Sequence, residues 1–224
     1  MPSRPLLCYI TDRRAFPGDE HSQRRRLLEK IAEAARCGVD YIQLRERDLP
    51  ARELETLARE AASLVKAGRS NPHRPTALLI NSRTDIALAC GAAGVHLRSD
   101  DVSPSTVRAI CRSGAVVHDS EARAIVAVSC HSAAQVAQAL ADGADFAVFA
   151  PVFEKKDAPG ARPAGLTQLQ EACRAKIPVL ALGGVTLENA QSCIAAGAAG
   201  IAGIRLFQEN EIAEVVGRLG RQRS

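Results

Sequence analysis

The feature that most constrains the fold is a regular alternation of short apolar runs with helical patterns. Eight runs rich in strand-favouring residues recur along the 224-residue chain: 6–11, 41–45, 77–81, 94–98, 125–130, 146–153, 178–184 and 200–205. Helical patterns with apolar residues at 3.6-residue spacing lie between them, among them 25–38, 54–68, 132–143 and 187–197. The sequence therefore predicts repeated βα units from end to end.

The junctions from helix to strand also resemble one another. Each ends a helix on glycine, makes a short turn and enters an apolar strand, as in CGVDYIQL, CGAAGVHL, DGADFAVF and AGAAGIAGI. Glycine suits a left-handed helix C-cap, and nearly continuous apolar strands suit a parallel sheet covered by helices. Eight such units predict one α/β domain over residues 1–224, a (β/α)8 TIM barrel. A doubly wound open sheet is the alternative, and the regular repetition favours closure.

Two segments depart from the repeat, and neither indicates a second domain. Residues 112–124 lengthen the approach to the fifth strand. Residues 154–165 form a loop rich in glycine, proline and lysine after the sixth strand, where barrels place active-site loops. The arginine-rich C-terminus, about residues 218–224, is predicted to be flexible.

Composition argues against several classes of function. The chain has a net charge of +4, 3% aromatic residues and no tryptophan, so neither a nucleic-acid partner nor stacking on aromatic rings is expected. Its seven cysteines form no CxxC pair, which favours reduced thiols and a cytoplasmic location. No apolar stretch is long enough for a membrane span, so no membrane contact is expected. Phosphorylated small molecules are compatible partners, and a homodimer is one possible assembly.

Polar side chains stand where the second predicted strand ends. Gln43, Arg45 and Arg47 alternate along the chain, so the two-residue period of a strand places them on one face. Two guanidinium groups in one row favour an anion such as phosphate. The structural alternative is a row of ion pairs that involves the nearby Glu46 or Asp48.

The third and fourth strands add an amide and two carboxylates. Asn81 ends the third strand, and the RSDD segment at 98–101 ends the fourth. Mg²⁺ takes one or two carboxylates together with waters and substrate phosphate, and Asp101 is the better candidate ligand. Alternatively, Asp100 or Asp101 caps the helix that begins near Pro104.

The fifth strand ends in Ser129, Cys130 and His131. Ser129 and His131 share one face and Cys130 has the other, so a nucleophilic pair of Cys130 and His131 is not expected. His131 directly precedes a helix. It could act as an acid or base, or it could bond only a neighbouring backbone group.

The last two strands end in glycines that are followed by helices. Gly183, Gly184 and Gly203 allow close backbone approach, and their surroundings predict a phosphate site built from backbone N–H groups, with Ile204 and Arg205 beside it. The structural alternative is that Gly183 and Gly184 only form a tight turn.

Taken in order, five segments of the chain closely resemble the thiamine-phosphate synthase family, including its thiazole tautomerase branch: YIQLRER, INSRTDIALACGAAGVHL, VSCHS, GADFAVFAPVF and PVLALGGVTLENAQSCIAAGAAGIAGI. The resemblance covers about residues 6–207. It implies a transferase that joins an aminopyrimidine diphosphate to a thiazole phosphate and releases pyrophosphate. It also implies that Mg²⁺ and basic residues hold the departing group.

Matching positions imply roles for single residues. Gln43 resembles the pyrimidine contact, Asp101 a metal ligand, Ser129 a site residue and Gly184 the thiazole-phosphate contact. The diphosphate contacts implied by the resemblance are Arg45, Arg47 and Asn81.

The chain also departs from the synthase pattern. Synthases usually carry lysine where this chain has Arg47, aspartate where it has Ser82, and a Thr-x-Thr-Lys stretch where it has EKKD. Ser82 removes one expected metal carboxylate, which puts Mg²⁺ in doubt. Lys155 or Lys156 could replace the missing loop lysine, and Lys156 therefore joins Ser129 and His131 as a candidate catalytic residue.

Three interpretations follow from these departures. The tautomerase branch resembles this chain in three respects: an Arg-Glu-Arg segment on the second strand, no aspartate at the position of Ser82, and a VFE segment after the sixth strand. The proton-shuttling histidine of that branch matches His131. Gln43, His96 and Asp101 look synthase-like and favour the synthase. A metal-independent tautomerase is the alternative, and a non-catalytic binder of phosphorylated thiamine precursors is the third.

Overall fold

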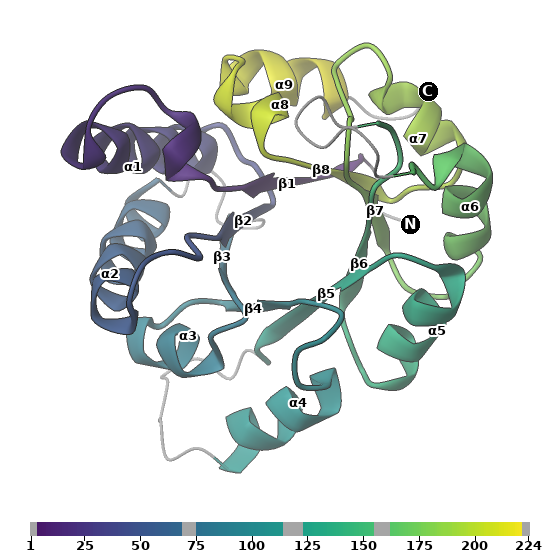
Figure 1. Cartoon of the computed structure of the whole chain (residues 1–224), viewed down its shortest axis with the longest axis horizontal. Coiled ribbons are helices and arrows are strands. Elements are labelled where there is room, and N and C mark those ends of the chain that lie inside the picture. The colour runs from purple at the N-terminus through teal and green to yellow at the C-terminus, as the bar shows by residue number, and fades with distance from the viewer. Residues whose placement is uncertain (1–3, 69–74, 114–122, 155–161, 221–224) are drawn as a thin grey trace.

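The structure, a computed structural model, describes residues 4–68, 75–113, 123–154 and 162–220 (Figure 1). Eight parallel strands pair in chain order, and the last closes onto the first to form a barrel. The strands are β1 (Leu6–Ile10), β2 (Tyr41–Leu44), β3 (Ala77–Asn81), β4 (Gly94–Leu97), β5 (Ile125–Cys130), β6 (Phe146–Phe149), β7 (Val179–Ala181) and β8 (Gly200–Gly203). The predicted TIM barrel is confirmed, and the open-sheet alternative is wrong.

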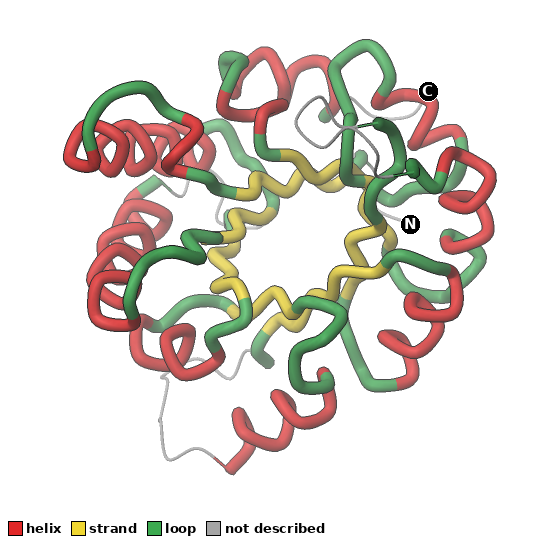
Figure 2. Tube along the Cα trace, in the orientation of Figure 1, coloured by secondary structure: helices red, strands yellow, loops and turns green. Residues whose placement is uncertain are grey.

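Helices surround the barrel on its outside (Figure 2). They are η1 (Arg13–Ala15), α1 (Glu20–Arg36), α2 (Ala51–Ala67), α3 (Thr84–Cys90), α4 (Pro104–Ser113), α5 (Ala133–Ala141), α6 (Gly165–Ala172), α7 (Ala190–Ala195), α8 (Arg205–Gln208) and α9 (Ile212–Leu219). No helix among the described residues is long and apolar enough to cross a membrane.

Some boundaries differ from those the sequence predicts. Helix α1 begins at Glu20 rather than residue 25, because Asp19 caps it by accepting a hydrogen bond from the Ser22 N–H, and its polar first turn carries no apolar period. Strand β6 ends at Phe149, before Pro151, which has no N–H to donate to a neighbouring strand. Arg218 and Leu219, assigned above to a flexible C-terminus, lie in α9, and residues 221–224 lie outside the described residues.

The side chains inside the barrel change from apolar to polar along its axis. Its filled layers are apolar and contain small side chains beside large ones: Leu6, Cys8, Ile10, Leu79, Ala127, Phe146, Val148, Leu180 and Ala202. Farther toward the carboxyl ends of the strands, the inward positions carry polar side chains instead, namely Gln43, Asn81, His96 and Ser129. Because all strands run in the same direction, the parallel barrel brings these polar groups to one end, here called the upper end.

Candidate active site at the upper end of the barrel

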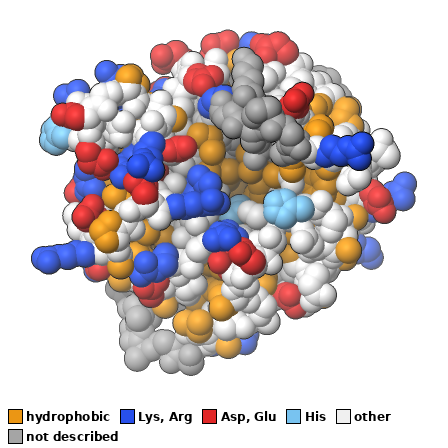
Figure 3. Space-filling view, in the orientation of Figure 1, with side chains coloured by type: hydrophobic (Ala, Val, Ile, Leu, Met, Phe, Trp, Pro, Cys, Tyr) orange, Lys and Arg blue, Asp and Glu red, His pale blue; other side chains and the backbone are white. Residues whose placement is uncertain are grey.

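Charged and polar side chains gather where the strands end. Figure 3 shows Lys, Arg and His side chains around a hollow at the centre of the face turned to the viewer, with hydrophobic side chains inside it. The chain topology brings the predicted residues of β2, β3, β4, β5, β7 and β8 to this end. Lys156, predicted as a loop residue of the site, lies outside the described residues.

A hydrogen-bond chain crosses three neighbouring strands. Gln43 Nε2 donates to Asn81 Oδ1 at 2.8 Å, Asn81 Nδ2 donates to Ser82 Oγ at 3.0 Å, and Ser82 Oγ donates to Asp101 Oδ2 at 2.6 Å. The structure thus brings together Gln43, Asn81 and Asp101 as expected. It also shows a role for Ser82, whose hydroxyl orients the Asp101 carboxylate. Gln43 Oε1 is buried and has no hydrogen-bond partner among the described residues, so it can accept from a ligand.

The Asp101 carboxylate faces the site and does not cap a helix. Besides Ser82, its Oδ2 atom accepts a 2.7 Å hydrogen bond from the Arg98 N–H. Helix α4 is capped instead by Ser103, whose Oγ accepts from the Thr106 N–H at 3.2 Å, and Asp100 pairs with Arg98 at 2.5 Å. The capping alternative for Asp100 and Asp101 is therefore wrong.

Asp101 could hold a divalent cation only with help from the substrate. The described residues include no group of three or more His, Cys, Asp or Glu side chains arranged to hold a metal ion. Hydrogen bonds occupy Oδ2 of Asp101, which leaves Oδ1 for a cation. One carboxylate with waters and substrate phosphate is a ligand set that Mg²⁺ accepts, so the residues fit such an ion.

His96 is a buried member of the site that sequence reasoning named only through the family resemblance. Its Nε2 atom lies 2.8 Å from Ser129 Oγ, and its Nδ1 is buried with no partner among the described residues. Burial, and then the positive charge of Arg45, lowers the pKa of His96 to about 4. The ring is therefore neutral near pH 7 and fixes the Ser129 hydroxyl. Its inward position on β4, beside Asn81 on β3, is the signal that could have identified it.

Arg45 and Arg47 carry charges that no carboxylate of the described residues neutralises by an ion pair. Glu46 and Asp48, their neighbours in the chain, pair with Arg13 instead, at 3.2 and 2.7 Å. The predicted alternative of an ion-pair row between these carboxylates and the two arginines is therefore wrong. Burial, and then the positive charge of Arg47, lowers the pKa of Arg45. A half-buried guanidinium beside a second one is a strong site for an anion.

The end of β5 has the alternation predicted for it. Cys130 is fully buried among outer residues that face the helices, and burial raises its pKa to about 11, so it forms no nucleophilic pair with His131. His131 is exposed, and its Nδ1 lies 2.7 Å from the Ala150 carbonyl oxygen. With Nδ1–H donating there, Nε2 of the neutral ring is left as an acceptor.

Gly183 and Gly184 form a tight turn that also leaves backbone donors free. Their φ angles are +96° and +65°, and a Cβ on Gly183 would lie 2.7 Å from Pro151 Cα. Among the described residues, no acceptor takes the N–H groups of Gly183, Gly184 or Val185. The turn and the phosphate site are therefore compatible interpretations. Helices α7 and α8 are short, which leaves these free N–H groups as the main attraction for an anion.

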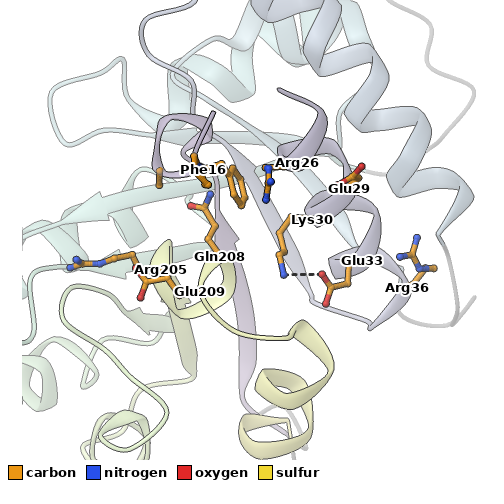
Figure 4. A pocket seen from close by; sticks show the side chains of 11 residues that line it. Phe16, Arg26, Glu29, Lys30, Glu33, Arg36, Arg205, Gln208 and Glu209 are labelled. Carbon is orange, nitrogen blue, oxygen red and sulfur yellow. Dashed lines mark ion pairs between the residues drawn. The ribbon is translucent and has the colours of Figure 1, made fainter. Parts of the chain in front are cut away.

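Gly203, Ile204 and Arg205 lie at the end of β8. Gly203 ends the strand, Ile204 packs against the apolar barrel interior, and Arg205 begins α8. Arg205 also lines a separate cleft of about 600 Å³ between α1 and α8, and its side chain extends away from Lys30 and Glu33 (Figure 4). Lys30 and Glu33 pair at 2.9 Å, and acidic and basic side chains alternate in this cleft, so it concentrates no single charge.

Comparisons with known proteins agree with this geometry. A family model described as thiamine monophosphate synthase matches residues 7–207. The thiamine-phosphate synthase of Roseiflexus castenholzii is 37% identical over 201 residues, which is 89% of this chain and 79% of that protein. The thiamine-phosphate synthase of Chlorobium luteolum is 34% identical over 219 residues, 97% of this chain and 92% of that protein.

A solved structure extends the likeness to three dimensions. The thiamine phosphate pyrophosphorylase from Pyrococcus furiosus superposes with a TM-score of 0.76 at 26% identity, covering 97% of this chain and 94% of that one. The matches extend over the whole barrel, including every strand end that contributes to the site. The chain therefore belongs to the thiamine monophosphate synthase family.

Proposed function

We propose that the chain is a thiamine-phosphate synthase that joins an aminopyrimidine diphosphate to a thiazole phosphate and releases pyrophosphate. The observation that carries the proposal is that two separate groups of donors suited to anions lie at one end of the barrel. Arg45 and Arg47 form one, and the free N–H groups of Gly183, Gly184 and Val185 form the other. A reaction between a diphosphate and a monophosphate requires two such sites.

In this proposal some residues of the site bind the substrates and others stabilise the charge that develops during the reaction. Gln43 Oε1, which has no partner among the described residues, accepts a hydrogen bond from the amine of the pyrimidine. Arg45 and Arg47 bind the diphosphate and stabilise the negative charge that grows on pyrophosphate as it leaves. Asp101 would hold Mg²⁺, which when bound neutralises further diphosphate charge. His96 Nε2, 2.8 Å from Ser129 Oγ, holds the Ser129 hydroxyl beside the reacting groups.

Several properties of the enzyme belong to the same proposal. Its location is cytoplasmic, as its reduced cysteines favour, and its partners are phosphorylated small molecules rather than nucleic acids. It acts with Mg²⁺ and assembles as a homodimer. Lys156 assists from the loop after β6.

The direct test is to incubate the purified chain with both precursors and Mg²⁺ and to detect thiamine phosphate by its mass. The wild-type protein should form the product, and Arg45→Gln should form far less. Absence of product at every Mg²⁺ concentration would overturn the synthase proposal.

His131 supports one second candidate, a thiazole tautomerase. Its ring is held at Nδ1 by the Ala150 carbonyl, which leaves Nε2 exposed as a base. A tautomerase would convert the thiazole carboxylate phosphate without metal, and His131→Ala would lose about 10²-fold or more in rate. If neither reaction occurs while the precursors still bind, the chain is a non-catalytic binder.

A further inference from the structure

Arg13 lies at the upper end of the barrel, and neither the composition nor the family resemblance draws attention to it. It follows β1, and only 4% of its side chain is exposed. We propose that Arg13 is a positioning residue that occupies the carboxylates of Glu46 and Asp48 and thereby keeps Arg45 and Arg47 available to a phosphorylated ligand. The inference rests on the proposed function in one respect, namely that the two arginines bind diphosphate.

One guanidinium binds three carboxylates. Arg13 Nη1 lies 3.2 Å from Glu46 Oε2 and 2.7 Å from Asp48 Oδ1, while Nη2 lies 2.7 Å from Asp48 Oδ2. Its Nε donates to Glu20 Oε1 at 2.7 Å. The two-point contact with Asp48 uses the planar fork of arginine, which a lysine lacks.

Glu46 is held in place by contacts other than those of the Arg13 side chain. Thr11 Oγ1 donates to Glu46 Oε1 at 2.6 Å, and the Arg13 N–H donates to Oε2 at 3.1 Å. The same Thr11 hydroxyl accepts from the Arg45 N–H at 2.9 Å. The network therefore fixes the backbone of Arg45 while it directs the neighbouring carboxylate toward Arg13.

Without Arg13, Glu46 would lose its one ion pair among the described residues, and Asp48 would keep only Arg14, whose Nε lies 3.6 Å from Asp48 Oδ2. Glu46 stands between Arg45 and Arg47 in the chain, and its side chain is 1% exposed. Burial raises the pKa of Glu46, so its charged form requires a cation nearby, and it already interacts with the charge of Arg45. An ion pair of Glu46 with Arg45, or of Asp48 with Arg47, would compete directly with a bound phosphate.

The test is calorimetric titration of the full-length protein with inorganic pyrophosphate. Wild type should bind. Arg13→Gln should weaken binding about tenfold or more, because the released carboxylates compete with pyrophosphate. Arg13→Gln combined with Glu46→Gln should recover most of the affinity, since the main competitor is then neutral. The matched control is Arg108→Gln. It removes another largely buried arginine, which pairs with Asp145 at the opposite end of the barrel. This control variant should bind pyrophosphate like wild type.

The outcomes separate this inference from the proposed function. If wild type does not bind pyrophosphate, both are overturned. If wild type binds and Arg13→Gln binds equally well, or if the double variant stays as weak as Arg13→Gln, only the role of Arg13 is overturned. If circular dichroism shows that Arg13→Gln does not fold, Arg13→Lys replaces it in the same cycle. Arg13→Lys keeps the positive charge but lacks the planar guanidinium. It should bind pyrophosphate about threefold more weakly than wild type, and adding Glu46→Gln should restore the affinity.

Discussion

The two ends of the barrel differ in whether their arginine side chains have carboxylate partners. At the end where the strands begin, Asp40 precedes β2 and pairs with Arg4 at 3.0 Å, and Asp145 precedes β6 and pairs with Arg108 at 2.5 Å. Both carboxylates also accept a backbone N–H from the neighbouring strand. At the upper end, Arg45 and Arg47 have no such partner among the described residues. Paired arginines close the lower end and stabilise the fold, whereas at the upper end Arg13 takes the nearby carboxylates and leaves Arg45 and Arg47 for an anion.

Glycine residues also serve different purposes at the two ends of the barrel. Gly94 and Gly200 begin β4 and β8, where a Cβ would collide with the backbone of Ile125 and Leu6, so these glycines allow the strands to pack at the lower end. Gly183 and Gly184 at the upper end instead shape a turn with free N–H groups. The same residue type thus serves packing at one end and recognition at the other.

The largest expected effect comes from removing an unpaired charge at the upper end. Arg45→Gln should lower kcat/KM for thiamine phosphate formation by about 10²–10³-fold, because charge on the leaving pyrophosphate loses a stabilising donor. The melting temperature should change little, since no ion pair is broken. Steady-state kinetics with Arg108→Gln as the control checks this. Equal losses in the two variants would show that the contrast between the ends has no functional meaning.

The polar interior of the upper end should make stability depend on pH. Folding lowers the pKa of His96 from 6.5 to about 4. Between these values the unfolded chain binds a proton that the folded chain does not. The free energy of unfolding should therefore fall by about 3 kcal/mol in total as the pH falls from 6.5 to 4, and this contribution levels off below pH 4.

Denaturant titrations at several pH values, compared between wild type and His96→Gln, isolate this contribution from that of the carboxylates. The variant should lose less stability on acidification. Parallel curves for the two proteins would rule out a buried neutral His96.

A smaller effect is expected from breaking a pair at the lower end. Arg108→Gln should lower the free energy of unfolding by about 1–2 kcal/mol, because Asp145 keeps its backbone donor and is partly solvated. Its kcat/KM should match that of wild type. Chemical denaturation together with the activity assay measures both, and a loss of activity without loss of stability would contradict the assigned structural role.

The smallest predicted effect concerns the metal site. Ser82 has a φ of +60°, a conformation that aspartate also tolerates, and its hydroxyl contacts Asp101. Ser82→Asp should raise the affinity for Mg²⁺ about fivefold in the presence of pyrophosphate by adding a second carboxylate, and Asp101→Ala should lower it. Competition with Mn²⁺, followed by electron paramagnetic resonance, reports the affinity. Unchanged affinity in both variants would place the cation elsewhere.

The sequence predicted those features that depend on local periodicity. Strand spacing predicted the barrel, and the two-residue period predicted that Cys130 lies on the opposite face from Ser129 and His131. It did not predict partners that only the closed fold brings together. Arg13 lies 33 residues before Glu46, so nothing local favoured it over Arg45 or Arg47 as the partner of that carboxylate. The contact of His96 with Ser129 likewise joins two neighbouring strands, β4 and β5, whose residues lie 33 positions apart in the chain.

The central claim is that the upper end alone is built to receive diphosphate. A crystal structure of the chain with pyrophosphate tests it most directly. The account predicts pyrophosphate within hydrogen-bond distance of the guanidinium groups of Arg45 and Arg47, with Arg13 still bound to Glu46 and Asp48. Pyrophosphate bound instead in the cleft between α1 and α8, with Arg45 and Arg47 paired to carboxylates of the protein, would contradict it.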